Sequence, residues 1–115
     1  EAQTCTQHSD VYFSRRAASF GAAVVGSISR LKVELCNPKD TEVTVHLAEL
    51  PLPFVVLHKE IQLGARAYVR IPVRFIPSVT RSAEDGPYTC DLKVTTAGGH
   101  SAAIALEAFS FSLKD

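Results

Sequence analysis

Residues 68–75 read YVRIPVRF, and every second residue in this run is apolar. The odd-numbered side chains are Val69, Ile71, Val73 and Phe75. They fall on one side of an extended chain, a pattern typical of a β-strand with one solvated face. Pro72 falls on the other side. Because proline has no N–H for a neighbouring strand, it predicts that this strand lies at a sheet edge or carries a bulge.

Six further segments are predicted to be strands; most of them show the same period of two, and 54–57 is a short apolar run whose facing is ambiguous. They cover residues 20–25, 31–35, 43–47, 54–57, 88–95 and 100–108. We expect 31–35 and 43–47 to pair as a hairpin across the polar loop 37–40, and the last two segments to pair across the turn 97–99. No window longer than about ten residues has helical spacing with caps. Seven short strands therefore predict an all-β, two-sheet sandwich.

Length and charge exclude several classes of protein. The chain has 115 residues, which suits one domain with its own core, and 12 basic side chains balance 12 acidic ones. Zero net charge removes the broad positive field that nonspecific binding to nucleic acid or an anionic membrane requires. The longest apolar stretch, residues 50–57, is far shorter than the roughly 20 residues of a bilayer span. We therefore expect no nucleic acid and no membrane as partner.

The cysteines leave two cellular settings open. Tyr88-Thr89-Cys90 matches the Tyr-x-Cys of an immunoglobulin F strand, and Cys36 is its candidate disulfide partner. The period of two, however, turns Cys36 outward and Cys90 inward, whereas an inter-sheet disulfide needs both sulfurs in the core. The odd number of cysteines and the absence of a glycosylation acceptor also favour reduced thiols inside the cell. The alternative is an extracellular immunoglobulin-like adhesion or receptor module.

No pattern predicts catalysis, a cofactor or a metal site. The chain has no G-x-S-x-G elbow and no Gly-rich phosphate loop between strand and helix. Three of its four histidines are expected on a solvated sheet face or at turns: His46, His58 and His100. Cys5 and His8 have a C-x-x-H spacing, but no second pair of ligands follows at the spacing of a zinc finger. A small enzyme on a β-sandwich would have only scattered serines and histidines in its favour.

Two groups of residues are candidates for binding a partner protein. The first is the outward row Arg66, Tyr68, Arg70 and Arg74, which could dock an acidic or phosphorylated peptide. An ordinary solvated face with cross-strand ion pairs is the alternative. The second is Phe109 and Phe111, where the apolar positions change from even to odd. Either a bulge intervenes, or these rings face another surface and pack on a neighbouring domain.

Several blocks of the sequence, in this order, resemble ASH domains, which are relatives of PapD and the major sperm protein. They are SFGAAVVGS at 19–27, LKVELCNP at 31–38, LPFVV at 52–56, VRIPVRFIP at 69–77 and GPYTCDL at 86–92. The resemblance predicts a domain over residues 19–108, with an N-terminal extension at 1–18 and a C-terminal one at 109–115. The chain has no initiator methionine and no targeting pattern, so either a signal has been removed or the chain is an excised piece. We expect an excised piece, because the pattern is that of one module with chain continuing at both ends.

Among ASH domains, the sequence is most similar to the tandem C-terminal domains of the centrosomal scaffolds of the spindle-defective family. The resemblance implies an intracellular, immunoglobulin-like sandwich of seven to eight strands at the centrosome. It implies a non-catalytic protein-interaction module with centrosomal and pericentriolar partners. Family roles would be centriole duplication, recruitment of pericentriolar material and mitotic spindle assembly.

Overall fold

The computed structural model describes residues 10–78 and 86–111, which form nine β-strands and no helix. In chain order the strands are β1 Tyr12–Phe13, β2 Ala17–Val24, β3 Ser29–Cys36, β4 Val43–Leu47, β5 Phe54–Val56, β6 Glu60–Leu63, β7 Tyr68–Phe75, β8 Tyr88–Thr96 and β9 Ser101–Phe111. The predicted all-β class is confirmed. All seven predicted strands are present.

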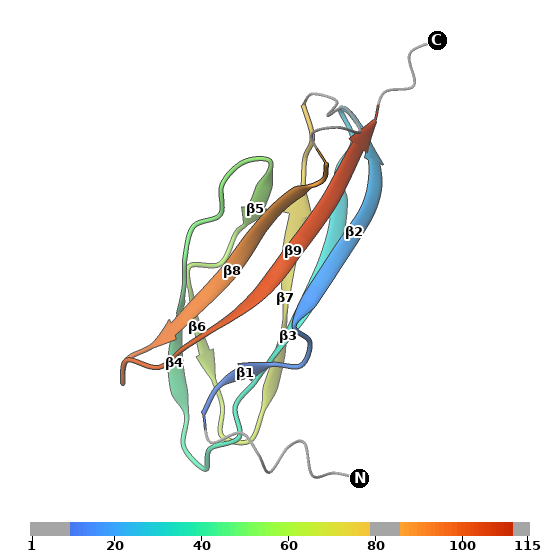
Figure 1. Cartoon of the computed structure of the whole chain (residues 1–115). Helices are drawn as coiled ribbons and strands as arrows, with labels where there is room; N and C mark the ends of the chain where they lie inside the picture. The colour runs from blue at the N-terminus through green and yellow to red at the C-terminus, as the bar shows by residue number, and fades with distance from the viewer. Residues whose placement is uncertain (1–9, 79–85, 112–115) are drawn as a thin grey trace, which may run out of the picture.

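The strands form two sheets that pack face to face (Figure 1). One sheet has the order β1-β3-β7-β5 and the other the order β2-β9-β8-β4-β6. Neighbours are antiparallel except β2 and β9, which run parallel. In Figure 1 the long strands β8 and β9 cross in front of β7. The predicted two-sheet sandwich is therefore confirmed, and the β8–β9 hairpin with it.

Side chains from the two inner faces fill one core. Phe75 on β7 is completely buried, and its ring centroid lies 5.3 Å from that of Phe54 and 5.8 Å from that of Phe20. The ring of Tyr88 meets Phe75 edge-on at 5.5 Å. Aromatic pairs at such distances add to the free energy gained from burial alone. This cluster joins strands from both sheets, and it lies where β5 pairs with the end of β7.

Two strands were not predicted from the sequence, β1 and β6. β1 has two residues, too few to show a period. β6 begins at Glu60, where the charged pair Lys59-Glu60 predicts a turn, and it pairs with β4 from Val43 to His46. A segment of four residues with one buried leucine shows too little alternation to predict a strand next to two adjacent charged residues.

The hairpin predicted between residues 31–35 and 43–47 is wrong. β3 lies in the four-stranded sheet beside β7, whereas β4 lies in the five-stranded sheet between β8 and β6. Residues 37–42 therefore carry the chain from one sheet to the other. Alternation shows which side chains of a strand face the core, but it does not show which strands are neighbours. Both β3 and β4 turn their apolar side chains to the core, although they do so from opposite sheets.

Pro72 has a local explanation. The register between β3 and β7 is continuous from Ser29↔Phe75 to Cys36↔Tyr68, so β7 has no bulge. On its other side β5 pairs with residues 73–75 and its register ends at Val56↔Val73. Although β7 lies inside the sheet order, Pro72 faces no β5 residue. Pro72 therefore lies at a local edge of the sheet, as predicted, but β7 as a whole is not an edge strand.

The tail keeps one parity to its end. In β9 the even-numbered side chains stay inward through Ser110, while Phe109 and Phe111 are 43% and 38% exposed. The β8–β9 register is continuous up to Ala108, and the register shift opposite the end of β9 lies in β2, between Ser19 and Ala22. The exposed rings therefore match the second alternative, rings on another surface. Leu113 lies outside the described residues. The domain boundaries at 18/19 and 108/109 stay a prediction, and paired strands extend from Tyr12 to Phe111.

No disulfide joins Cys36 and Cys90. Cys90 shares the inner face of β8 with the buried Leu92, and Cys36 shares the outer face of β3 with Glu34, as the alternation predicts. The disulfide of the immunoglobulin-superfamily alternative is therefore absent between these two residues. Cys5 lies outside the described residues.

Candidate functional site

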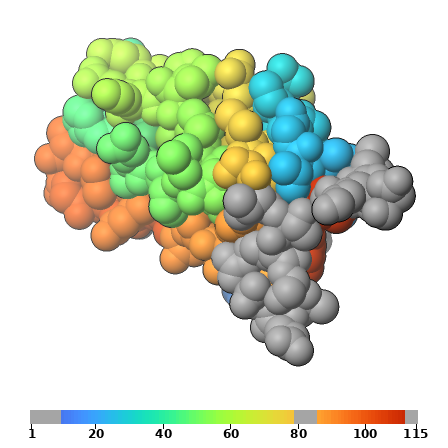
Figure 2. Space-filling model, turned by 90° about the horizontal axis from the view of Figure 1, so that it is seen from above, coloured from blue at the N-terminus to red at the C-terminus, as the bar shows by residue number. Residues whose placement is uncertain are grey.

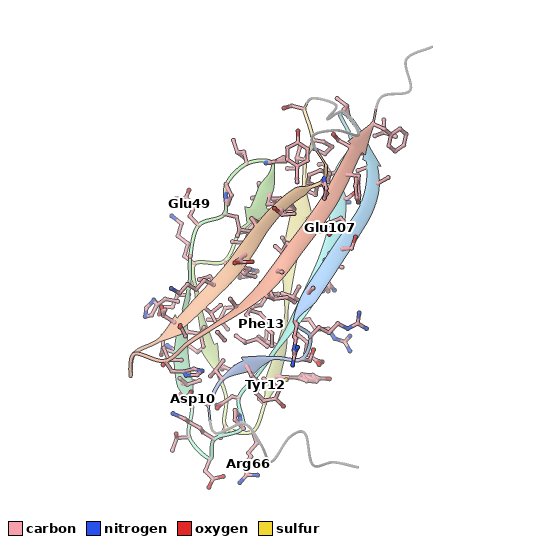
Figure 3. The ribbon with its side chains drawn as sticks, in the orientation of Figure 1. Asp10, Tyr12, Phe13, Glu49, Arg66 and Glu107 are labelled. Atoms are coloured by element: carbon pink, nitrogen blue, oxygen red, sulfur yellow. The ribbon has the colours of Figure 1, made fainter. Side chains whose placement is uncertain are left out.

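Arg66 lies in the turn before β7, not on the sheet face. Its backbone is left-handed, with φ 58°, and its amide N–H donates to the carbonyl of Lys39 at 2.9 Å. The guanidinium Nε donates to Asp40 Oδ1 at 2.7 Å. Figure 3 shows Arg66 at the lower end of the sandwich. Its charge is thus compensated by a local carboxylate, away from the rest of the predicted row.

Asn37, which was expected in the polar loop 37–40, positions this end of the molecule. It is buried, and its Nδ2 donates to the carbonyls of Thr41 at 3.0 Å and Gly64 at 2.9 Å. Its Oδ1 accepts the amide N–H of Lys39 at 3.0 Å. One side chain thereby ties the loop 37–42 to the β6–β7 turn. The only sequence signal was Asn-Pro, which is equally typical of a solvated turn.

Tyr68 and Arg70 occupy the outer face of β7 as predicted. The Arg70 guanidinium carbon lies 5.9 Å from the centroid of the Tyr68 ring, within the range of a cation–π contact. Its Nε lies 3.9 Å from Glu34 on β3. Such a contact near the distance limit between exposed groups contributes little to stability. This part of the row matches the alternative of a solvated face with cross-strand pairs.

The other part of the row is different. The register places Arg74 directly opposite Arg30, and Pro72 opposite Lys32. We call the outward side chains Arg30, Lys32, Arg70 and Arg74 the basic face. Glu34 is the one carboxylate on the outer faces of β3 and β7. Arg30 and Lys32 were not predicted as site residues, because the pairing of β3 with β7 was not predicted from the sequence.

The opposite outer face carries the other sign. Asp91 on β8, Glu107 on β9 and Glu60 on β6 are outward there, against Lys93. Next to Asp91, burial raises the pKa of the Cys90 thiol to about 11, and the Asp91 carboxylate adds to the effect. At neutral pH this cysteine is a thiol, which is a poor nucleophile. A chain with zero net charge therefore has two faces of opposite sign.

A groove of about 400 Å³ runs along the open edge of β3, next to the basic face. β1 pairs with β3 at Leu35 and Cys36, and the chain then crosses to the five-stranded sheet, where it forms β2. Arg15, Lys32, Glu34 and Arg70 line the rim, and Leu31, Val33, Ala18 and Ile104 provide apolar lining. The groove thus places cations beside the partly exposed Ala18 and Leu31, whereas Val33 and Ile104 are almost fully buried.

Apolar side chains gather at the end of the sandwich where β9 finishes. They are Ile28, Leu52, Ile76, Phe109 and Phe111, and we call them the apolar end. Backbone hydrogen bonds tie these segments together, from Val25 N–H to the Phe111 carbonyl at 2.8 Å and from Ile76 N–H to the Pro53 carbonyl at 2.9 Å. Figure 2, which looks down on this end, shows the end of β7 between residues near 55 and residues near 28.

The histidines have local partners or lie at turns. His46 Nδ1 lies 3.7 Å from Glu60 across β4 and β6, and His100 Nε2 lies 2.9 Å from the Val11 carbonyl. Within residues 10–78 and 86–111, no three metal-binding side chains gather in one place. Cys5 and His8 fall outside these ranges. The same ranges contain no helix that could cross a bilayer.

Replacing Arg30 by glutamate is expected to stabilise the fold by about 0.5 kcal/mol, because like charges directly opposite on neighbouring strands repel and opposite ones attract. Urea denaturation at low ionic strength measures this change. Arg30→Gln, which removes the repulsion without adding attraction, should give a smaller gain. Both gains should shrink in 0.5 M NaCl because salt screens exposed charges. A loss of stability at low salt would contradict the assigned register.

Comparison with known proteins identifies the chain's relatives. The family model described as Cep192 domain 8 matches residues 6–111. A solved ASH/PapD-like domain of human CEP192, PapD-like domain 7, is 17% identical with a TM-score of 0.77, over 91% of this chain and 87% of that one.

Two further solved structures come from C. elegans. WR4, a member of the MSP family, is 8% identical with a TM-score of 0.63, over 90% of this chain and 100% of that one. SSP-19, described as an MSP-domain protein like family member, is 9% identical with a TM-score of 0.61, over 82% of this chain and 94% of that one. These likenesses confirm the PapD-like fold expected from the resemblance. The comparison with curated protein sequences found no match.

Proposed function

Because the chain belongs to the Cep192 domain 8 family, we propose that it is a non-catalytic scaffold domain of a centrosomal protein. The match of residues 6–111 to the family is the observation that carries this proposal. In this role the domain holds partner proteins at the centrosome and so serves centriole duplication, recruitment of pericentriolar material and spindle assembly.

The surface supports an interaction role better than a catalytic one. A catalytic site needs a nucleophile or an acid–base pair that converges in a pocket. Here the two histidines with polar contacts engage Glu60 and a backbone carbonyl. The Cys90 thiol has a raised pKa. The exposed features with unusual composition are instead broad ones, the basic face and the apolar end, which suit contact with other proteins.

We assign Phe109 and Phe111 to contact with a neighbouring domain of the same protein. Both rings are more than a third exposed at the end of β9, and Ile28 and Ile76 extend the apolar surface beside them. Burying such rings against a second domain would gain roughly 25 cal/mol for each Å² of apolar surface removed from water. The family names themselves number this domain as one of several, which provides such a neighbour.

Domain replacement in the full-length protein tests this function. In cells depleted of the endogenous protein, a version lacking residues 6–111 is expected to recruit less pericentriolar material and to assemble fewer bipolar spindles. A version in which the PapD-like domain 7 of human CEP192 replaces these residues keeps the spacing and the fold. If either version restores centrosome number and spindles fully, the domain is a spacer and not a docking surface. A third version, Phe109→Ser with Phe111→Ser, tests the domain contact separately.

A further inference from the structure

The basic face has charges that no described residue neutralises. Within the described residues Arg30, Lys32 and Arg74 form no ion pair, whereas Arg70 has Glu34 and Arg66 has Asp40. Arg30 and Arg74 also face one another across the β3–β7 pair. Two guanidinium groups side by side, with an ammonium group at the next outward position, raise the local potential and lower the stability of the free domain. A bound anionic group would relieve this repulsion.

We propose that the basic face binds an extended acidic segment of a partner protein, lying along β3 and β7. The inference rests on the proposed function, since it names the chemistry of a partner for the scaffold domain. Outward side chains on one strand recur every second residue, about 6.7 Å apart. An extended peptide with acidic residues at alternate positions has the same repeat. Its first carboxylate meets Arg30 and Arg74, and its second meets Lys32.

The shape of the basic face suits a peptide backbone. Opposite Lys32 stands Pro72, a short and half-buried side chain between the longer Arg70 and Arg74. This leaves a low point between the two rows of cations. Toward Arg70, the groove beside β3 adds the partly exposed side chain of Leu31 next to Arg15 and Lys32. A segment with an apolar residue beside its acidic residues can therefore use both the charges and the groove.

The charge distribution selects a protein segment over a membrane or a nucleic acid. The outer face of the five-stranded sheet carries Asp91, Glu107 and Glu60, and the chain as a whole has no net charge. Long anionic polymers and anionic bilayers attract proteins through a field that extends beyond single contacts. Here the opposite face weakens that field, whereas a short segment within a Debye length of about 10 Å feels mainly the basic face.

Fluorescence anisotropy with the 115-residue chain tests the proposal. The probe is a fluorescein-labelled octapeptide of alternating Glu and Val, and a peptide of alternating Gln and Val is the neutral control. We expect saturable binding of the acidic probe at low ionic strength, weakened by added salt, and no binding of the neutral one. In 15N-labelled protein, the amide shifts caused by the acidic probe should concentrate on β3 and β7.

The decisive comparison uses two variants with the same change of charge. Lys32→Glu is expected to weaken binding of the acidic probe by about tenfold, which corresponds to about 1.4 kcal/mol. Lys93→Glu, an exposed strand position on the opposite sheet, should change binding less than twofold. Arg30→Glu should weaken binding although it does not destabilise the fold, so lost binding cannot be attributed to unfolding.

Three results would overturn the proposal: no binding of the acidic probe at low salt, equal effects of Lys32→Glu and Lys93→Glu, or shifts confined to the five-stranded sheet. Sedimentation with phosphatidylserine vesicles is run in parallel. Vesicle binding without peptide binding would assign the basic face to a membrane instead. If the acidic peptide does not bind but domain replacement still reduces recruitment of pericentriolar material, the proposed centrosomal role stands and only the peptide proposal fails. If the domain binds the peptide but proves to be a spacer in cells, the peptide proposal stands and the proposed scaffold role fails.

Discussion

Phe75→Ala is expected to lower the free energy of unfolding of the domain by about 4 kcal/mol. Phe75 has no exposed surface, and its ring is in contact range of Phe20, Phe54 and Tyr88. Its removal takes away the transfer free energy of a whole ring and leaves a cavity among three rings that are held by three different strands, β2, β5 and β8. Because the sheets pack over this point, the neighbours cannot collapse fully into the space.

Urea denaturation followed by far-UV circular dichroism measures the loss. Phe111→Ala is the matched control, since it removes the same ring from an exposed position on β9 and should cost less than 1 kcal/mol. If Phe75→Ala does not fold at all, Phe75→Leu should still fold, with a smaller loss because it leaves a smaller cavity. Equal losses for Phe75→Ala and Phe111→Ala would contradict the placement of the core.

The fold class followed from the sequence because alternation is a local signal. Val69, Ile71 and Val73 show which side of β7 faces the core without any knowledge of its neighbours. The same logic placed Cys36 and Cys90 on opposite faces, and no disulfide joins them. In the tail it left two alternatives, because Ser110 occupies an inward position that the pattern would give to an apolar residue.

The candidate site was found in part because its residues come from two strands. The row on β7 is continuous in sequence, so Tyr68, Arg70 and Arg74 could be grouped in advance. Arg30 and Lys32 join them through strand pairing, which depends on contacts between residues about 40 positions apart and is not encoded in either segment alone. Arg66 shows the opposite error, since one left-handed residue in the turn removes it from the period of the strand.

The second large effect is expected at Asn37. Asn37→Ala should lower the free energy of unfolding by about 3 kcal/mol, because a 2% exposed side chain amide is lost together with its partners. The carbonyls of Thr41, Leu63 and Gly64 lose a donor, and the Lys39 amide loses its acceptor. Unpaired backbone groups in a buried site cost more than the hydrogen bonds contribute when made.

Asn37 differs from Phe75 in where the damage should appear. The Arg66 amide donates to Lys39 in the loop that Asn37 holds, so amide hydrogen exchange at Arg66 and Ala67 should accelerate far more than at Leu92 in β8. Gln62→Ala, an exposed amide on the neighbouring β6, is the control and should change stability by less than about 0.5 kcal/mol. If Asn37→Ala costs no more than Gln62→Ala, the crossing between the sheets does not depend on this side chain. The connection 37–42 would then be held by its other contacts, among them the ion pairs Lys39–Asp10 and Asp40–Arg66.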